Sequence, residues 1–204
     1  LNPDLVLTFS DVQATLSKEL ISEGFNVIAF NQRTVSEIFA MIESLGALLN
    51  CPKKAFILVD RLKKIAFETQ SKVKLPKPKI YFEEWNEPLI TGVSWVSDVI
   101  ELAGGIDVFI SKSKSSKAEG RVVSSQEVIE ANPDIIIGSW CGKKVNFDMI
   151  KKRAGWEQIK AVSNGNIFEV KSPIILQPGP VVITHGLSEL SKIVCSWHDL
   201  TGGN

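Results

Sequence analysis

Several short hydrophobic runs with the composition of buried strands are followed by residues that could contact a ligand. The runs span residues 5–9, 80–82, 135–137 and 167–170. In an open parallel sheet, ligands gather beyond the carboxyl ends of the strands, so the residues after each run are candidates for a binding site. These candidates are Asp11, Glu84, Trp85, Trp140, Cys141 and Gln177.

Three of the five tryptophans are expected at this edge: Trp85 and Trp140 follow strands, and Trp95 opens a helix that should face the same side. A single tryptophan belongs more often to a core than to a site, because it buries a large area wherever it lies. Three at one edge favour a site. Flat indoles beside Glu84 and Gln177 suit a large, partly apolar ligand with amides or hydroxyls, held by stacking and a few polar contacts.

Cys141 could act as a nucleophile in an exposed turn, but its thiol needs a base to form the reactive thiolate. The two histidines, His185 and His198, lie near the C-terminus, and no motif pairs either with the cysteine. Packing or ligand contact is therefore the favoured interpretation of Cys141. Glu83 and Glu84 are neighbours on a strand and point to opposite faces, so they do not form one acid–base pair.

The composition is that of a globular chain without an overall charge bias. The 204 residues include 23 Lys and Arg against 23 Asp and Glu, and 44% are hydrophobic. Zero net charge gives no global reason to expect nucleic acid or an anionic membrane as a partner, although it is compatible with a local basic patch. Three cysteines without Cys-x-x-Cys spacing and two histidines indicate neither a disulfide framework nor a metal site.

Two distant segments are alike. NPDLVLTFSD occupies positions 2–11 and NPDIIIGSWC occupies positions 132–141, and each is typical of a turn followed by a strand buried on both faces. An amphipathic run and a second strand follow each copy, which predicts one βαβ unit used twice. A helix is expected before the second copy only. We therefore expect that residues once preceded Leu1 and that the first domain is incomplete.

A single long amphipathic helix is expected between the copies, because hydrophobic residues recur at three- and four-residue spacing from Pro52 to about Val73. Two prolines and four lysines between positions 72 and 79 then end the helix and mark a boundary. The sequence predicts an α/β fold with two three-layer α/β/α domains, parallel sheets and this one connecting helix. The expected divisions are 1–50 for the incomplete first domain, 51–76 for the helix and 77–204 for the second domain.

This order resembles the periplasmic binding proteins of ABC importers for cobalamin, iron siderophores and haem, and the cobalamin-binding members most. The resemblance covers essentially the whole chain. It is carried by the two NPD turns, YFEEWNEP at 81–88, GVSW at 92–95, AGG at 103–105, GSWCGK at 138–143, KSP at 171–173 and LQPGP at 176–180. It implies a substrate-binding protein without enzymatic activity, whose ligand lies between two domains held at a nearly constant angle by the long helix.

The resemblance also assigns a cleft wall and a ligand. The wall of the second domain would contain Glu84, Trp85, Leu89, Trp95, Trp140 and Cys141, and Asp11 would face it from the first domain. The ligand would be a corrinoid such as cobalamin, or a siderophore, with no catalytic cofactor. The protein would lie in the periplasm or another extracytoplasmic space, or in the cytoplasm if the gene start encodes no signal.

Docking to an ABC permease would use an acidic residue near the start of the helix before the second NPD turn. That position is Gln126 in this chain, with Glu127 next to it, and a shift of one residue turns a helical side chain by about 100°. Two other functions stay open: a soluble corrinoid-binding regulator or chaperone without a permease, and a thiol enzyme that uses Cys141. Because an incomplete domain exposes sheet edges and core, self-association is also expected.

Overall fold

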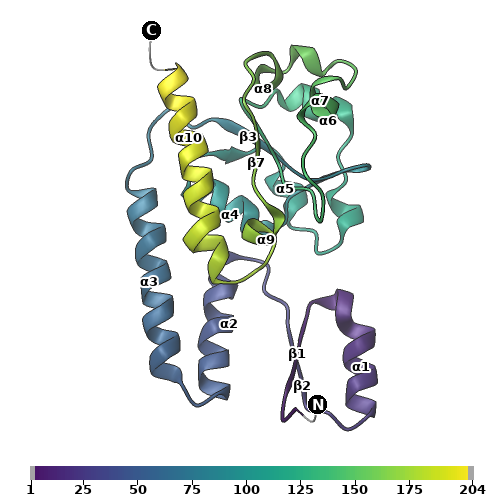
Figure 1. The fold of residues 1–204 in the computed structure, drawn as a ribbon, viewed down its shortest axis with the longest axis vertical. Coiled ribbons are helices and arrows are strands. Elements are labelled where there is room, and N and C mark those ends of the chain that lie inside the picture. The colour runs from purple at the N-terminus through teal and green to yellow at the C-terminus, as the bar shows by residue number, and fades with distance from the viewer. Residues whose placement is uncertain (1–2, 202–204) are drawn as a thin grey trace.

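The computed structural model describes residues 3–201 and shows a small N-terminal unit (residues 3–34) next to a larger body (residues 35–201; Figure 1). In the N-terminal unit, strand β1 (Val6–Phe9) is followed by the 3-10 helix η1 (Asp11–Gln13), helix α1 (Ala14–Ser22) and strand β2 (Val27–Phe30). The two strands are parallel, and α1 lies beside them. This arrangement is the βαβ unit that the first NPD turn predicts.

Two packed helices, α2 (Val35–Leu48) and α3 (Pro52–Gln70), lead from the N-terminal unit to the large sheet. α2 begins with a capping box in which the side chains of Thr34 and Glu37 each accept a hydrogen bond from the other's backbone N–H. The turn between the helices is tight, because a Cβ atom on Gly46 would lie 2.3 Å from the Cβ atom of Ala55. α3 is the long helix predicted from the sequence, whereas α2 is an additional helix.

The body contains a five-stranded sheet. Its strands are β3 (Lys79–Asn86), β4 (Leu89–Thr91), β5 (Ile106–Asp107), β6 (Ile135–Gly138) and β7 (Ile167–Glu169). β6 lies between β3 and β7 and is parallel to both, as the second NPD turn predicts. β4 runs antiparallel to the last residues of β3, so β3 continues past the strand of residues 80–82 expected from the sequence.

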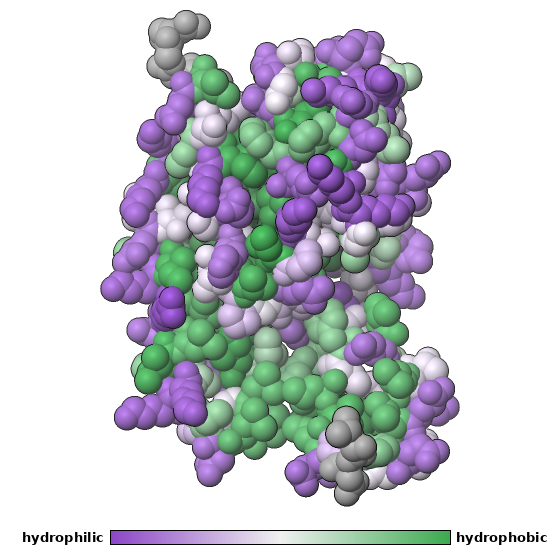
Figure 2. Space-filling view, viewed as in Figure 1, coloured by the Kyte–Doolittle hydropathy of each residue, from purple (hydrophilic) through white to green (hydrophobic). Residues whose placement is uncertain are grey.

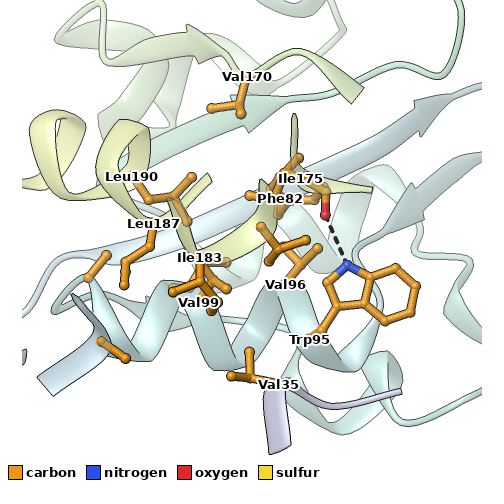
Figure 3. Packing of buried hydrophobic residues seen from close by; sticks show 14 of the residues in the cluster. Val35, Phe82, Trp95, Val96, Val99, Val170, Ile175, Ile183, Leu187 and Leu190 are labelled. Atoms are coloured by element: carbon orange, nitrogen blue, oxygen red, sulfur yellow. Dashed lines mark hydrogen bonds between the residues drawn. The ribbon is translucent and has the colours of Figure 1, made fainter. Parts of the chain in front are cut away.

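The alternation of side chains along β3 places one hydrophobic core on each face of this sheet. Ile80 and Phe82 point into the first core, and Tyr81 points into the second. The first core is covered by α2, α3, α4 (Ser94–Leu102), α9 (Ser172–Ile175), the π-helical turn η4 (Val182–Gly186) and α10 (Leu187–Thr201) (Figure 3). The second is covered by α6 (Ser125–Ala131), α7 (Phe147–Lys151), η3 (Trp156–Gln158) and α8 (Lys160–Ser163). Helices on both faces give the body three layers.

The fold class predicted from the sequence is confirmed: the chain is α/β, with parallel strand pairs in two parts and a long helix leading into the second. Short helices α5 (Ile110–Ser113) and η2 (Ala118–Arg121) connect β5 to α6. The domain divisions at 50 and 76 stay predictions, and α2 packs with α3 and α4 in the first core. Within residues 3–201, no helix is both long and apolar enough to cross a membrane.

Candidate ligand-binding cleft

A cleft of about 650 Å³ lies between the N-terminal unit and the body. On the N-terminal side it is lined chiefly by Phe9, Ser10, Asp11, Val12 and Arg33. On the body side it is lined chiefly by Glu84, Val93, Trp95, Lys117, Arg121 and Leu176. The carboxyl ends of β1 and β3 both reach this cleft, and parallel sheets bind ligands at the carboxyl ends of their strands. The cleft volume falls in the range of roughly 300–1,000 Å³ usual for small-molecule sites.

Ser10, Asp11 and Arg33 form a hydrogen-bonded group on the N-terminal side. The Arg33 guanidinium donates to the Ser10 hydroxyl at 3.0 Å and to the Asp11 carboxylate at 2.9 Å, and the Ser10 hydroxyl donates to the same carboxylate at 2.8 Å. These contacts lower the pKa of Asp11, the Ser10 hydrogen bond more than the Arg33 charge. Ser10 has a φ of 67°, so a strained backbone turn lies where β1 meets the cleft.

Glu84 and Arg121 form an ion pair on the body side. The two carboxylate oxygens of Glu84 accept hydrogen bonds from Arg121 at 2.5 and 3.0 Å, and Arg121 also donates to the carbonyl of Thr91 at 2.6 Å. The Arg121 side chain is 5% exposed and that of Glu84 is 20% exposed. Such a two-point contact has a specific geometry, so it ties η2 to the β3–β4 hairpin.

Trp95 belongs to the apolar part of the cleft wall, together with Val93 and Leu176. It lies in the first turn of α4, where its indole N–H donates to the carbonyl of Ile175 at 2.9 Å (Figure 3). This hydrogen bond ties α4 to α9 and holds the ring in one orientation. Because Trp95 is only 3% exposed, it presents a small part of its ring to the cleft and not an open stacking face.

The charges in the cleft are largely balanced, since Arg33 and Arg121 are each paired with a carboxylate. Val12 and Leu176 add apolar surface beside these pairs. Balanced charges next to apolar residues suit a large ligand that is bound by apolar contact and hydrogen bonds. Among the residues that the structure describes, no group of three or more His, Cys, Asp or Glu is placed to hold a metal ion.

Asp11, Glu84 and Trp95 are the residues expected from the sequence that line the cleft. Trp140 lies elsewhere. Its side chain is 4% exposed, packs in the second core and donates its indole N–H to Glu83 at 2.9 Å. The structure thus places Trp140 apart from the cleft lining, because the buried carboxylate of Glu83, which also pairs with Arg153, holds the indole on the other face of the sheet.

Trp85 and Leu89 lie on the β3–β4 hairpin and do not line the cleft. The indole N–H of Trp85 donates to the carbonyl of Glu87 at 2.8 Å, and the ammonium group of Lys143 lies 4.3 Å from the ring centroid. A cation–π contact within the chain thus covers one face of this indole. Leu89 is partly buried against the second core.

Cys141 and Gln177 are both exposed, and neither lines the cleft. Cys141 lies in the turn after β6, while the contacts described for His185 and His198 are with their own chain neighbours near the C-terminus. Gln177 lines a separate groove of about 510 Å³ beside β1 and β2. The structure thus places these two candidates apart from Asp11, Glu84 and Trp95.

Gln126 and Glu127 lie in the first turn of α6. Glu127 completes a capping box with Ser124 and pairs with Lys112 at 2.7 Å. The contact with Lys112, followed by the hydrogen bonds with Ser124, lowers the pKa of Glu127 to about 2. The side-chain amide of Gln126 donates to Glu130 at 2.9 Å. Glu127 is thus engaged within the chain, whereas Gln126 and Glu130 are exposed.

Two arginines in the cleft are absent from the candidates read from the sequence. Arg33 follows β2 by three residues, so the rule that ligands lie beyond strand ends, applied to β2, identifies it. Arg121 comes from η2, and no sequence pattern links it to Glu84, which precedes it by 37 residues. Its role depends on tertiary contact alone.

Several known proteins are similar to this chain. The structure of a possible iron-binding (periplasmic solute-binding) protein from Staphylococcus epidermidis has a TM-score of 0.79 at 28% identity, over 94% of this chain and 76% of that chain. An ABC transporter substrate-binding protein from Listeria monocytogenes has a TM-score of 0.80 at 21% identity, over 95% and 77%. A protein from S. aureus complexed with haem has a TM-score of 0.76 at 18% identity, over 94% and 77%. The last two likenesses show the fold alone.

A curated relative is described as an uncharacterized ABC transporter substrate-binding lipoprotein of Bacillus subtilis. It is 27% identical over 203 residues, which are 95% of this chain and 62% of the relative. This chain therefore spans 62% of the length of that relative.

A family model described as Periplasmic binding protein matches residues 1–174. The matched region includes β1, η1, β3, α4 and η2, which supply most of the cleft lining. The chain belongs to the periplasmic binding protein family.

Proposed function

We propose that the chain is the substrate-binding component of an ABC importer and that it holds its solute in the cleft between the N-terminal unit and the body. The observation that carries this proposal is the cleft of about 650 Å³, lined from the carboxyl ends of β1 and β3. Membership of a family of binding proteins means that the chain is not an enzyme and has no catalytic cofactor. The ABC substrate-binding relatives support the transport role.

We infer that the solute is a large metal chelate, such as a ferric siderophore, haem or a corrinoid. The neighbour from S. epidermidis is described as possible iron-binding, and the neighbour from S. aureus contains haem. These descriptions favour an iron chelate over cobalamin, the ligand that the sequence resemblance puts first. The cleft suits a chelate because it combines apolar surface with positively and negatively charged hydrogen-bonding groups.

In this proposal the ligand is held from both sides of the cleft. Asp11 and Arg33 contact it from the N-terminal unit, and Glu84 and Arg121 contact it from the body. Hydrogen bonds to charged groups contribute roughly 1.5–3 kcal/mol each. Since each arginine has a carboxylate partner, the ligand gains these bonds without needing a large net charge of its own.

Titration of the purified protein with a ferric hydroxamate siderophore, haemin and cyanocobalamin tests the ligand class. Each of these absorbs light and quenches tryptophan fluorescence when it binds near Trp95. Saturable quenching by one ligand, absent with the iron-free siderophore or the metal-free porphyrin, supports the proposal. If none of the three gives saturable binding at tens of micromolar, the proposed function is wrong.

The substitution Val12→Asp tests whether the ligand occupies this cleft. Val12 is 85% exposed in the structure, so the change leaves the fold intact while it removes apolar contact and introduces a charge. We expect about tenfold weaker binding, equivalent to about 1.4 kcal/mol. Ile110→Asp is the matched control, because Ile110 is 51% exposed and lies outside the cleft lining. Equal affinities for the two variants would place the ligand elsewhere.

We also propose an extracytoplasmic location and docking to a permease through the start of α6, where Gln126 is exposed and Glu127 is half-buried. The description of the Bacillus subtilis relative as a lipoprotein supports this location. A photo-crosslinking residue at position 126, expressed in the native cells, should capture an ABC permease subunit identified by mass spectrometry. Crosslinks from position 160, which is also exposed, serve as the control. Capture of a cytoplasmic protein instead would favour the alternative function, a soluble corrinoid-binding regulator without a permease.

A further inference from the structure

The charges of this neutral chain are distributed unevenly. The segment 52–79, which contains α3 and the residues that lead into β3, has nine of the 23 basic residues and only two of the 23 acidic ones, Asp60 and Glu68. The basic residues are Lys53, Lys54, Arg61, Lys63, Lys64, Lys72, Lys74, Lys77 and Lys79. Eight of them are exposed, and Lys77 is half-buried. This segment is therefore strongly basic, and Asp98 and Glu101 of α4 are the carboxylates that share a groove with its Lys63 and Phe67.

Large hydrophobic side chains lie among these charges on the outer surface of α3. Phe56 is 69% exposed, Ile57 is 58% exposed and Phe67 is 72% exposed. They are not part of the buried face of the helix, which consists of Ala55, Val59, Leu62 and Ala66. Two phenylalanines this exposed on one helix indicate an interaction surface for another molecule or a membrane.

The geometry of the helix brings the two rings onto one line. Phe56 and Phe67 are separated by about 20° around the axis and by about 16 Å along it, because eleven residues make almost three whole turns. Lys53, Lys63 and Lys64 fall within about 70° of that line, and so does Asp60, so three cations and one carboxylate flank the rings. In Figure 1, α3 forms the edge of the molecule on the left, and Figure 2 shows hydrophilic side chains beside hydrophobic ones along this edge.

We propose that the outer face of α3 docks on an anionic lipid membrane, with Phe56 and Phe67 inserted at the level of the headgroups and the lysines against their negative charges. Apolar side chains on a basic helix bind such surfaces by combining apolar burial with electrostatic attraction. Charge decides between this occupant and a second copy of the chain, because a symmetric dimer through α3 would place two basic faces against each other. α3 contributes no residue to the lining of the cleft, so docking leaves the cleft accessible.

Co-sedimentation with lipid vesicles tests the proposal independently of the transported ligand. The protein is mixed with vesicles of equal parts phosphatidylglycerol and phosphatidylcholine, or with pure phosphatidylcholine, at low and at high salt. We expect binding to the anionic vesicles at least tenfold stronger than to the neutral ones, and weakened by salt because salt screens exposed charges. Equal binding to both compositions, or no binding to the anionic vesicles at low salt, overturns the proposal.

Variants show whether α3 provides the contact. Phe56→Ser combined with Phe67→Ser, and Lys53→Glu combined with Lys64→Glu, should each lower binding to anionic vesicles at least tenfold. Phe147→Ser is the matched control, because Phe147 is 39% exposed on α7, and its binding should equal that of the parent. Circular dichroism verifies that each variant is folded. Undiminished vesicle binding in the double phenylalanine variant, or a dimer that this variant converts to a monomer, overturns the proposal and makes the face a self-association surface.

Discussion

The Asn-Pro-Asp turn occurs twice in this molecule, and the strands that follow it, β1 and β6, have different surroundings. After Asn-Pro-Asp, every residue of β6 is buried, whereas Thr8 is the only buried residue of β1. Leu7 is 48% exposed, and its counterpart Ile137 is 0% exposed. Local sequence therefore determines that a strand forms, and the layers packed against its two faces determine how deeply the strand is buried.

The two regions also differ in what they bury. The body has two hydrophobic cores, but among the described residues before Val35 the buried side chains are polar: Thr8, Ser10, Ser17 and Gln32. The hydroxyl oxygens of Thr8 and Ser17 lie 2.8 Å apart, so β1 and α1 are joined by a hydrogen bond where β6 and its helices are joined by apolar packing. We expect the body to hold most of the stability, and the N-terminal wall of the cleft to open at lower free energy.

The largest expected contrast concerns the ion pairs of the two regions. Glu83→Gln removes a carboxylate that is 0% exposed and leaves the charge of Arg153 without its partner, so it should cost about 3–5 kcal/mol. Asp11→Asn breaks the pair with Arg33. The Asp11 carboxylate is 44% exposed, so water screens this pair and the loss of stability should be much smaller than that of Glu83→Gln. Urea unfolding followed by circular dichroism measures both. Equal costs would mean that the N-terminal unit is as tightly packed as the body.

A second contrast uses the matched strand positions. Ile137→Ala deletes buried methyl groups and should cost about 2–5 kcal/mol of unfolding free energy, since its surroundings are hydrophobic on both faces of the sheet. Leu7→Ala removes a side chain that is already half exposed and should cost less than about 1 kcal/mol. The urea concentrations at the unfolding midpoints of the two variants measure this difference. A large cost at Leu7 would show that this residue is covered in solution.

The sequence predicts much of this fold because its signals are local. The two NPD turns, the spacing of hydrophobic residues in α3 and the prolines after it specify their elements without tertiary information. α2 also has a local signal, since Thr34 and Glu37 form a capping box before Ile38 and Ile42, which are buried four residues apart.

The cleft is harder to predict because it depends on contacts between distant residues. Asp11, Glu84 and Trp95 follow from the rule for strand ends and helix starts, but the place of Trp140 depends on Glu83, 57 residues away. Arg121 likewise reaches the cleft through its contact with Glu84. Neither pairing leaves a periodic pattern in the chain, so only the folded structure reveals which face each side chain takes.

A smaller effect is expected from the polar core of the N-terminal unit. Thr8→Val combined with Ser17→Ala replaces both partners of the buried hydrogen bond by apolar groups. The Ser17 hydroxyl also donates to the carbonyl of Gln13 at 2.9 Å, but Gln13 is exposed and water can replace this bond, so the change in unfolding free energy should stay within about 1 kcal/mol. Hydrogen exchange of the β1 amides is the more local measurement and should change as little. A loss of several kcal/mol would show that this hydrogen bond, and not packing, holds β1 to α1.

The smallest expected effect compares the capping boxes of α6 and α2. The folded-state pKa of Glu127 is about 2, below its usual value of 4.5, so its stabilising contribution is complete above pH 4.5 and is lost as the pH falls from 4.5 toward 2. Glu127→Gln should therefore lower stability by about 0.5 kcal/mol at neutral pH, a modest value because the side chain is 41% exposed, and this deficit should vanish near pH 2.

Glu37→Gln is the matched variant in α2, where hydrogen bonds from the Arg33 and Thr34 backbones lower the pKa of Glu37. Arg33 belongs to the N-terminal unit. If Glu37→Gln lowers stability and also speeds hydrogen exchange of the β2 amides, this cap couples the N-terminal unit to the body. An effect confined to α2 would leave the two regions independent.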